Sequence, residues 1–147
     1  MNYWFECKVS YERQADGMGM KKVSELYLVD AMSFTEAEER IIKEIQPLVS
    51  IGELEVSNIK RVKLAELFLN EREEADHYYK ARVNFITIDE KSGMEKKAGV
   101  NMLIKSESLS EAVTELVNQM EKQLGAYEVA SVTDTQILDV FRYGTQQ

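Results

Sequence analysis

Two pairs of adjacent lysines occupy the same place in a repeated pattern. Lys21-Lys22 and Lys96-Lys97 each follow a polar, glycine-containing segment and precede an apolar run. The basic residues that we assign to this hypothesis, in these pairs and in the neighbouring strands, are Lys8, Lys21, Lys22, Lys80, Arg82, Lys96 and Lys97. Ammonium and guanidinium groups neutralise phosphates, and aromatic rings beside them stack on bases. These residue types therefore suggest binding of single-stranded nucleic acid as one hypothesis.

The aromatic residues that would stack on bases lie in the same segments as the cations. They are Tyr3, Trp4, Tyr78 and Tyr79. A simpler interpretation is that alternating Glu and Lys form ordinary cross-strand pairs, and that most of the rings belong to the buried side. The net charge of −8 also opposes general affinity for nucleic acid. We favour the simpler interpretation and keep nucleic-acid binding as the alternative.

Residues for catalysis are sparse. The chain has one histidine, His77, and one cysteine, Cys7, and neither stands in a local signature for nucleophilic catalysis. Gly17 and Gly19 lie in a predicted hairpin loop rather than between a strand and a helix, where a dinucleotide fingerprint belongs. We assign no catalytic, cofactor-binding or metal-ligating residue. An enzyme that depends on carboxylates is a third hypothesis, with acidic residues on one helix at Glu36, Glu38, Glu39 and Glu44.

The elements that must position these residues form a repeat. Residues 5–11 and 79–85 both alternate apolar and polar side chains, so each is predicted to be a strand with one buried face. A polar hairpin turn follows each of them, and second strands are predicted through 27–29 and 102–104. Ser33 with Glu36, and Ser108 with Glu111, are capping boxes that start two amphipathic helices. Pro47 and the glycines at 52 and 125 are predicted to end these helices.

A further strand follows each helix. The segment from Gly52 to Val56, with Ile59 beyond, is matched by the segment from Gly125 to Val129, with Val132 beyond. We expect each of these strands, which we allow to be bent, to continue through Leu64, Leu67 and Phe68, and through Ile137, Val140 and Phe141. The charge-rich residues 71–76 are predicted to be a surface linker.

The predicted fold is therefore α+β, an internal duplication of a β-β-α-β unit. We expect one domain over residues 1–147, with repeat one at 1–70 and repeat two at 77–147. Each repeat supplies one helix that covers antiparallel sheet, and the two repeats are expected to relate by a pseudo-two-fold axis. The pattern leaves open whether the repeats share one sheet or form two.

Large apolar residues also occur on the side opposite the predicted core. They are Trp4, Leu26, Leu28, Ile86 and Leu103. A solvated sheet face is not expected to carry so many. The simpler explanation is that the other repeat covers this face, and the second is that it is an interface with a partner or with another copy of the chain.

The remaining composition points to a water-soluble protein of a reducing compartment. With 147 residues, 44% hydrophobic and 30% charged, the chain has the composition of a globular domain. It contains no apolar run long enough to cross a bilayer. The single cysteine and the absence of signal-peptide character at the start predict a cytoplasmic location, without membrane association or a bound cofactor.

The run Trp4-Phe5-Glu6-Cys7-Lys8-Val9, together with residues 27–31 and 33–38, resembles a small family of unknown function from gut-associated bacteria and their phages. The similarity extends over nearly the whole chain, and its motifs are structural. The resemblance implies a cytoplasmic accessory protein from a mobile element and brings no functional residues. Our leading hypothesis is a non-enzymatic module that binds an unidentified protein or associates with itself.

Overall fold

The computed structural model describes residues 2–15, 17 and 19–143. Within them the fold is α+β, with eight strands in two four-stranded sheets and two α-helices. The chain divides into two compact units. Unit 1 contains residues 1–63 and 136–147, and unit 2 contains residues 64–135. Unit 2 is therefore a continuous segment inserted into unit 1.

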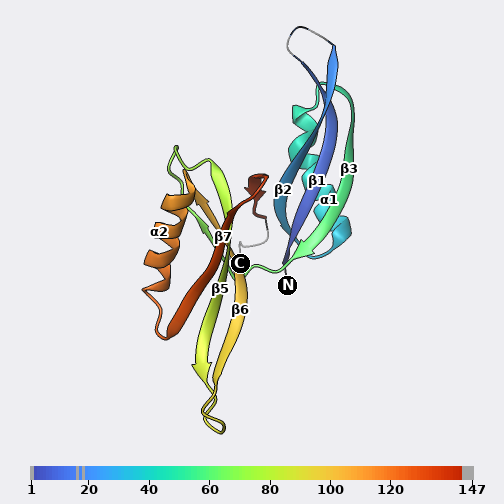
Figure 1. The fold of residues 1–147 in the computed structure, drawn as a ribbon. Helices are drawn as coiled ribbons and strands as arrows, with labels where there is room; N and C mark the ends of the chain where they lie inside the picture. The colour runs from blue at the N-terminus through green and yellow to red at the C-terminus, as the bar shows by residue number, and fades with distance from the viewer. Residues whose placement is uncertain (1, 16, 18, 144–147) are drawn as a thin grey trace. The chain divides into compact units, whose positions relative to one another are not determined.

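Unit 1 is a sheet with one helix on it. Its strands are β1 (Tyr3–Gln14), β2 (Met20–Ala31), β3 (Ile51–Val62) and β8 (Ile137–Phe141), in the order β3-β1-β2-β8. The first three are antiparallel neighbours, whereas β8 runs parallel to β2. Helix α1 (Phe34–Ile45) and the short 3-10 helix η1 (Gln46–Leu48) connect β2 to β3. Helix α1 lies along one face of the sheet, as Figure 1 shows.

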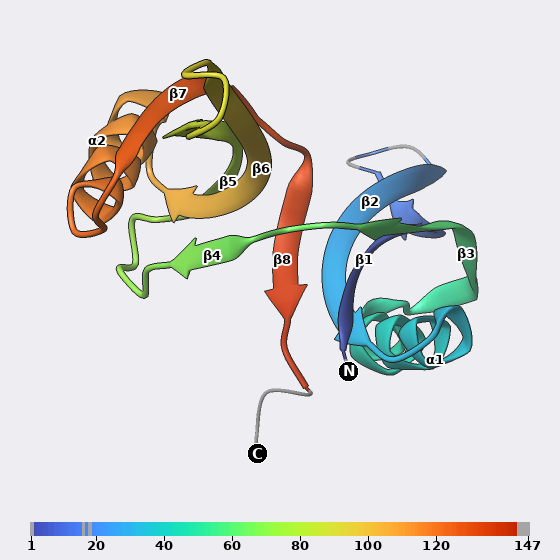
Figure 2. The same cartoon turned by 90° about the horizontal axis from the view of Figure 1, so that it is seen from below.

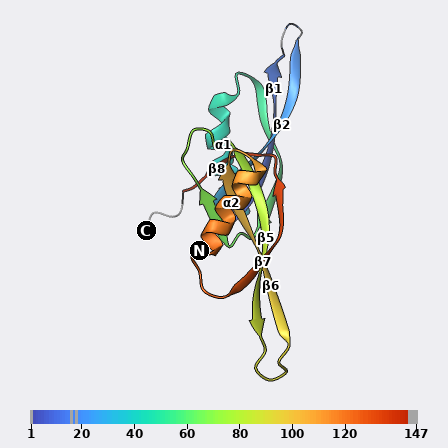
Figure 3. The ribbon, with the colours of Figure 1, turned by 60° about the vertical axis from the view of Figure 1, so that its left-hand side comes forward.

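Unit 2 has the same plan. Its strands are β4 (Glu66–Leu69), β5 (His77–Ile88), β6 (Glu95–Ser106) and β7 (Ala126–Asp134), in the order β4-β6-β5-β7. Strand β4 runs parallel to β6, and the other pairs are antiparallel. Helix α2 (Leu109–Met120) packs against β6 and β7. The β5–β6 hairpin extends well beyond the end of α2, which Figure 3 shows clearly.

The two predicted capping serines are confirmed as the N-caps of the helices. Ser33 Oγ accepts a hydrogen bond of 3.1 Å from the backbone N–H of Glu36, and Ser108 Oγ accepts one of 3.2 Å from that of Glu111. The Glu36 carboxylate accepts a bond from the N–H of Met32, one residue before the cap. The two serine contacts satisfy donors that would otherwise be unpaired in the first helical turn.

Each helix buries one stripe in the core of its own unit. The core of unit 1 contains Phe5, Cys7, Val9, Tyr11, Tyr27, Val29, Ala31, Ala37, Ile41 and Ile45. The core of unit 2 contains Tyr79, Ala81, Val83, Met102, Ile104, Ala112, Leu116 and Met120. The predicted buried parity of the strands is therefore confirmed. Burial raises the pKa of the Cys7 thiol to about 12, as expected for a core residue.

The segment after each third strand differs from our expectation. Residues 66–69 and 137–141 do not continue β3 and β7 but form separate short strands, β4 and β8. Strand β4 follows β3 of unit 1 in the sequence yet pairs with β6 of unit 2. Strand β8 follows β7 of unit 2 yet pairs with β2 of unit 1, where Figure 2 shows it alongside β2. The alternation of apolar residues indicated strands here, but it could not identify their partners.

Gly52 also has a different role from the predicted one. Helix α1 ends at Ile45, and Gly52 lies inside β3 with φ +77°. This is where the register between β1 and β3 shifts, between Ser10 and Glu12. A bulge position with positive φ favours glycine, because a residue with a side chain would have a strained backbone there.

The caps provide a direct stability prediction. Replacement of Ser108 by Ala should lower the free energy of unfolding by about 1 kcal/mol, because the N–H of Glu111 loses its acceptor. Denaturant unfolding followed by circular dichroism measures the change. Thr114→Ala is the control, since Thr114 is exposed within the same helix and alanine is the better helix former. An equal loss in both variants would contradict the capping role.

Candidate functional site

The structure divides the seven predicted basic residues among four surfaces, two in each unit. Lys80 and Arg82 on β5 and Lys97 on β6 share the face of the unit 2 sheet that is opposite α2. We call this the helix-free face of unit 2. Lys96 belongs to the other side of β6, which α2 covers farther along the strand. The register therefore brings three of the four predicted basic residues of unit 2 onto one face.

The basic residues of unit 1 are less concentrated. Lys8 and Lys22 lie on the sheet face opposite α1, and Lys21 lies on the same side as the core residues. Lys22 is directly across from Glu12, so a carboxylate and an ammonium group share this part of the face. The predicted cations of unit 1 are thus spread over two sides of its sheet, whereas three of those of unit 2 share one face, together with Glu128.

The Arg82 side chain lies over Gly99, where the missing side chain leaves room for it. Its Nη1 donates to Asn101 Oδ1 at 3.4 Å, and its guanidinium lies across the backbone of Gly99. A Cβ atom at Gly99 would lie 2.7 Å from Arg82 Cζ and 2.8 Å from Nε, too close for both to remain. Among the ion pairs within the described residues, none includes Arg82. Its planar group is exposed and preorganised for a carboxylate or phosphate.

Lys97 is already engaged within the sheet. Its Nζ lies 3.0 Å from Glu128 Oε1, and Asn84 Nδ2 donates to the same oxygen at 3.0 Å. The hydrogen bond from Asn84 and the neighbouring Lys97 lower the pKa of the Glu128 carboxyl. The hydrogen bond to Glu128 raises the pKa of Lys97. Of the predicted cations on this face, Lys80 and Arg82 take no part in the ion pairs of the described residues. Lys105 of β6, which was not among the predicted residues, lies on the same face with its Nζ 5.7 Å from the centre of the Tyr78 ring.

The aromatic residues predicted to stack on bases are largely covered. Tyr78 and Tyr79 are only 3% and 5% exposed. Tyr3 and Trp4 are half-buried, with the Arg61 guanidinium 3.6 Å from the ring of Tyr3 and that of Arg142 5.9 Å from the ring of Trp4. Stacking on bases would therefore have to use Tyr3 and Trp4 of unit 1, not the rings beside Lys80 and Arg82.

The five apolar residues opposite the predicted cores lie as the strand parity indicated. Trp4, Leu26 and Leu28 are on the helix-free face of unit 1, and Ile86 and Leu103 are on that of unit 2. Leu28 and Leu103 are fully buried, and the other three are half-buried. Their role as an interface with a partner stays a prediction.

A cluster that sequence reasoning missed lies beside the last strand of unit 1. Asp30 is 2% exposed, and its Oδ1 accepts a hydrogen bond of 2.6 Å from the backbone N–H of Tyr143. Arg40 Nη1 donates to the carbonyl oxygen of Asp30 at 2.6 Å and lies 3.6 Å from its carboxylate. The Arg40 guanidinium is also 4.7 Å from the centre of the Tyr143 ring. An aspartate in an apolar strand was the available signal for this cluster.

The acidic residues of α1 contribute to this cluster rather than to a catalytic pair. Glu36 Oε1 lies 3.4 Å from Arg40 Nη2, and Glu44 accepts a hydrogen bond from the hydroxyl of Tyr143. Glu38 and Glu39 are exposed. Burial and the bond to Glu44 raise the pKa of Tyr143 to about 12. We call Asp30, Arg40, Glu44 and Tyr143 the C-terminal clasp.

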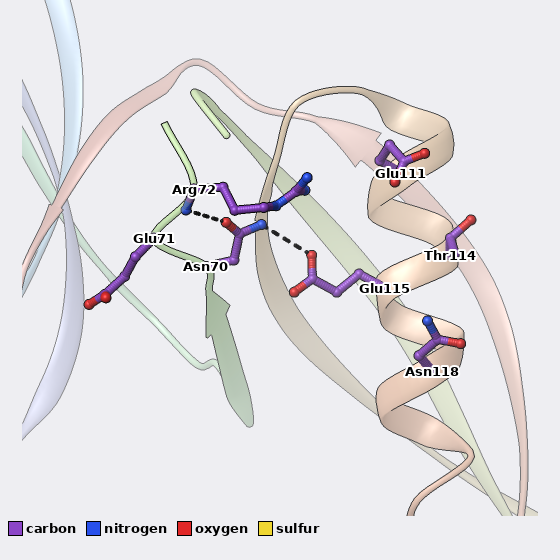
Figure 4. Close-up of a pocket in the computed structure, with 7 residues that line it drawn as sticks. All are labelled: Asn70, Glu71, Arg72, Glu111, Thr114, Glu115 and Asn118. Atoms are coloured by element: carbon purple, nitrogen blue, oxygen red, sulfur yellow. Dashed lines mark hydrogen bonds between the residues drawn. The ribbon is translucent and has the colours of Figure 1, made fainter. Parts of the chain in front are cut away.

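Carboxylates also line a shallow depression of about 330 Å³ in unit 2, drawn in Figure 4. Glu115 accepts a hydrogen bond of 3.4 Å from Asn70, and Glu71 points away from α2. The acidic groups of the depression therefore do not meet at one point. Within the described residues, no group of three or more His, Cys, Asp or Glu side chains is placed to hold a metal ion.

The contact between Gly99 and Arg82 can be tested by a single substitution. In Gly99→Ala, the methyl group should displace the Arg82 guanidinium while the sheet keeps its stability, because the end of an arginine side chain moves at little cost. Side-chain N–H resonances of arginine in an NMR spectrum report the displacement. Gly93→Ala is the control. Gly93 lies at the hairpin turn, no atom is within 4 Å of a Cβ added there, and the arginine resonances should stay unchanged. An unmoved Arg82 resonance in Gly99→Ala would contradict the packing.

The raised pKa of Tyr143 predicts a loss of stability in alkali. Its folded-state pKa of about 12 exceeds the ordinary value of 10.0, so its contribution is present below pH 10 and disappears as the pH rises towards 12. Tyr143→Phe cannot ionise and should lose less stability than the wild type across that interval. Urea unfolding at a series of pH values measures the difference, and parallel curves would contradict it.

Comparisons with known proteins confirm one part of the resemblance noted from the residues, that to a family of unknown function. Helices long and apolar enough to span a bilayer do not occur in the described part of the chain. Neither the curated proteins nor the solved structures gave a match. A family model described as "Domain of unknown function (DUF4494)" matches residues 3–143. The chain therefore belongs to this family of unknown function.

Proposed function

We propose that the chain is a non-enzymatic binding module, and that the helix-free face of unit 2 binds an anionic protein partner. The observation that carries the proposal is the exposed Arg82 guanidinium, which lies over Gly99 and bonds to Asn101, with Lys80 on the same strand face. Arginine in a fixed orientation favours bidentate binding of carboxylates. Three cations, those of Lys80, Arg82 and Lys105, suit a short acidic segment better than a long polyanion.

Charge reversal with a matched control tests this proposal. Arg82→Glu should abolish capture of the partner in an affinity pull-down from the native host, because the carboxylates then repel each other. Lys96→Glu makes the same change in charge on the opposite side of β6 and should retain the partner. Loss of capture in both variants, or in neither, would contradict the assignment of the face.

The second candidate is a single-stranded nucleic-acid-binding protein. The shared position of Lys80, Arg82 and Lys97 on one sheet face favours it. Three cations on this face, Lys80, Arg82 and Lys105, can contact phosphates. A plot of the logarithm of the binding constant against the logarithm of the salt concentration should therefore have a slope of about −2.1. Fluorescence polarisation with a labelled oligonucleotide at two salt concentrations measures this slope. Absence of binding at low salt would eliminate this candidate.

The duplication and the cellular context belong to the same proposal. We infer a duplicated β-β-α-β unit from the matching strand orders β3-β1-β2-β8 and β7-β5-β6-β4, with one helix after the second strand of each. A single domain made of repeats 1–70 and 77–147 remains part of this proposal. So does the role of a cytoplasmic accessory protein from a phage or mobile element, which the neighbouring genes would test.

A further inference from the structure

The outer edge of β2 can be completed only by a strand from outside residues 1–70. Strand β3 ends at Val62, opposite Trp4, whereas β8 begins beside Leu26, which is opposite Lys8. A strand in the place of β8 would have to start three strand spacings away from the end of β3 and four residues back along the strand direction. The distance from Val62 to that starting point is about 19 Å. Residues 63–65 allow at most about 14 Å between Val62 and Glu66. Strand β4 therefore cannot close the sheet of unit 1.

The edge of β2 is instead an acceptor for one particular segment. Residues Leu26, Tyr27, Leu28 and Val29 pair with residues 137–141, in a parallel arrangement. The ring of Phe141 stacks on that of Tyr27, with centroids 5.6 Å apart. Ile137 at the start of the strand is only 6% exposed. The segment contributes both backbone pairing and apolar contacts to unit 1.

The C-terminal clasp makes this acceptor selective. The buried carboxylate of Asp30 binds the backbone N–H of Tyr143, and Glu44 binds the hydroxyl of the same residue. Unit 2 has opposite charges at the equivalent positions. Lys105 takes the place of Asp30, three residues before the capping serine, and Glu115 takes the place of Arg40, seven residues after it. There, Asn70 follows the added strand and donates to the Lys105 carbonyl oxygen and to Glu115. The two acceptors thus recognise different strand ends.

The connection to β8 is short and held at one end. Thr135 donates from its N–H and from its hydroxyl to the carbonyl oxygen of Tyr78, at 3.0 and 2.8 Å. Gln136 alone separates Thr135 from β8. Short hinges favour exchange of a strand between copies of a chain, because the exchanged form makes the same contacts as the closed one. The connection from β4 to β5 is longer, over residues 70–76, so β4 can fold back within its own chain.

We propose that unit 1 also accepts β8 from a second copy of the chain, which gives a strand-exchanged dimer held by the C-terminal clasp. The occupant is residues 137–143 of that copy, because the acceptor already binds this segment within one chain. The acceptor of unit 2 is filled by β4 from the same continuous segment and does not exchange. This proposal is independent of the anion-binding face of unit 2.

Cysteine pairing between two differently marked chains tests the exchange. In a Cys7→Ala background, one chain carries Leu28→Cys and the other carries Val140→Cys, at positions that are opposite each other in β2 and β8. After the two are unfolded and refolded together at about 1 mM, the effective concentration of a short linker, an intermolecular disulfide should form. Chains mixed without unfolding should form much less of it.

The matched control uses the equivalent pair in unit 2, Leu67→Cys and Leu103→Cys in separate chains. This pair should give little intermolecular disulfide under the same conditions. Absence of the disulfide between the cysteines at positions 28 and 140, or equal yields for the two pairs, would overturn the proposal.

If the cysteine variants do not fold, a second experiment uses the unmodified protein. Two differently isotope-labelled preparations are refolded together, and isotope-filtered NOEs then report contacts between chains. Intermolecular contacts between Tyr27 and Phe141 support exchange, and their absence overturns it.

Discussion

The parallel pairing of β8 with β2 is the contact on which unit 1 depends. Strand β8 reaches its partner only after the chain has passed through all of unit 2. Four register pairs, the stacked rings of Tyr27 and Phe141 and the C-terminal clasp hold it there. Unit 2 has no comparable dependence on distant residues, because its four strands belong to one continuous segment. The two units therefore share a plan but differ in what closes them.

The clasp illustrates why a buried charge is retained at such a position. Removing Asp30 from water is costly, and the Tyr143 N–H together with the nearby Arg40 guanidinium offset that cost. The arrangement is complete only when Tyr143 is in place, so the same groups that stabilise unit 1 also select the segment that closes it. Equivalent positions in unit 2 carry the reversed charges and use the amide of Asn70 instead. Specificity for a strand end is thereby separated from the apolar pairing that both units have.

Local pattern was sufficient for much of the fold. Period-two alternation located β1 and β5 with the correct buried face, and the capping serines located the starts of both helices. The partners of β4 and β8 could not be predicted, because short apolar segments carry no information on which distant edge they join. The cluster around Asp30 was missed for the same reason, since its members are far apart in the sequence. Arg82 was named among the cations, but its contact with Gly99 depends on strand register, which the pattern alone did not give.

Native-state hydrogen exchange is the most direct test of the dependence of unit 1 on β8. The account predicts that the amides of β8, and those of β2 that pair with it, exchange through an opening that costs less free energy than exposure of the central amides of β5 and β6. It also predicts that Asp30→Asn lowers the free energy of this opening without changing exchange in β5 and β6. A single common exchange free energy for β8, β2, β5 and β6, lowered equally by Asp30→Asn, would contradict the account.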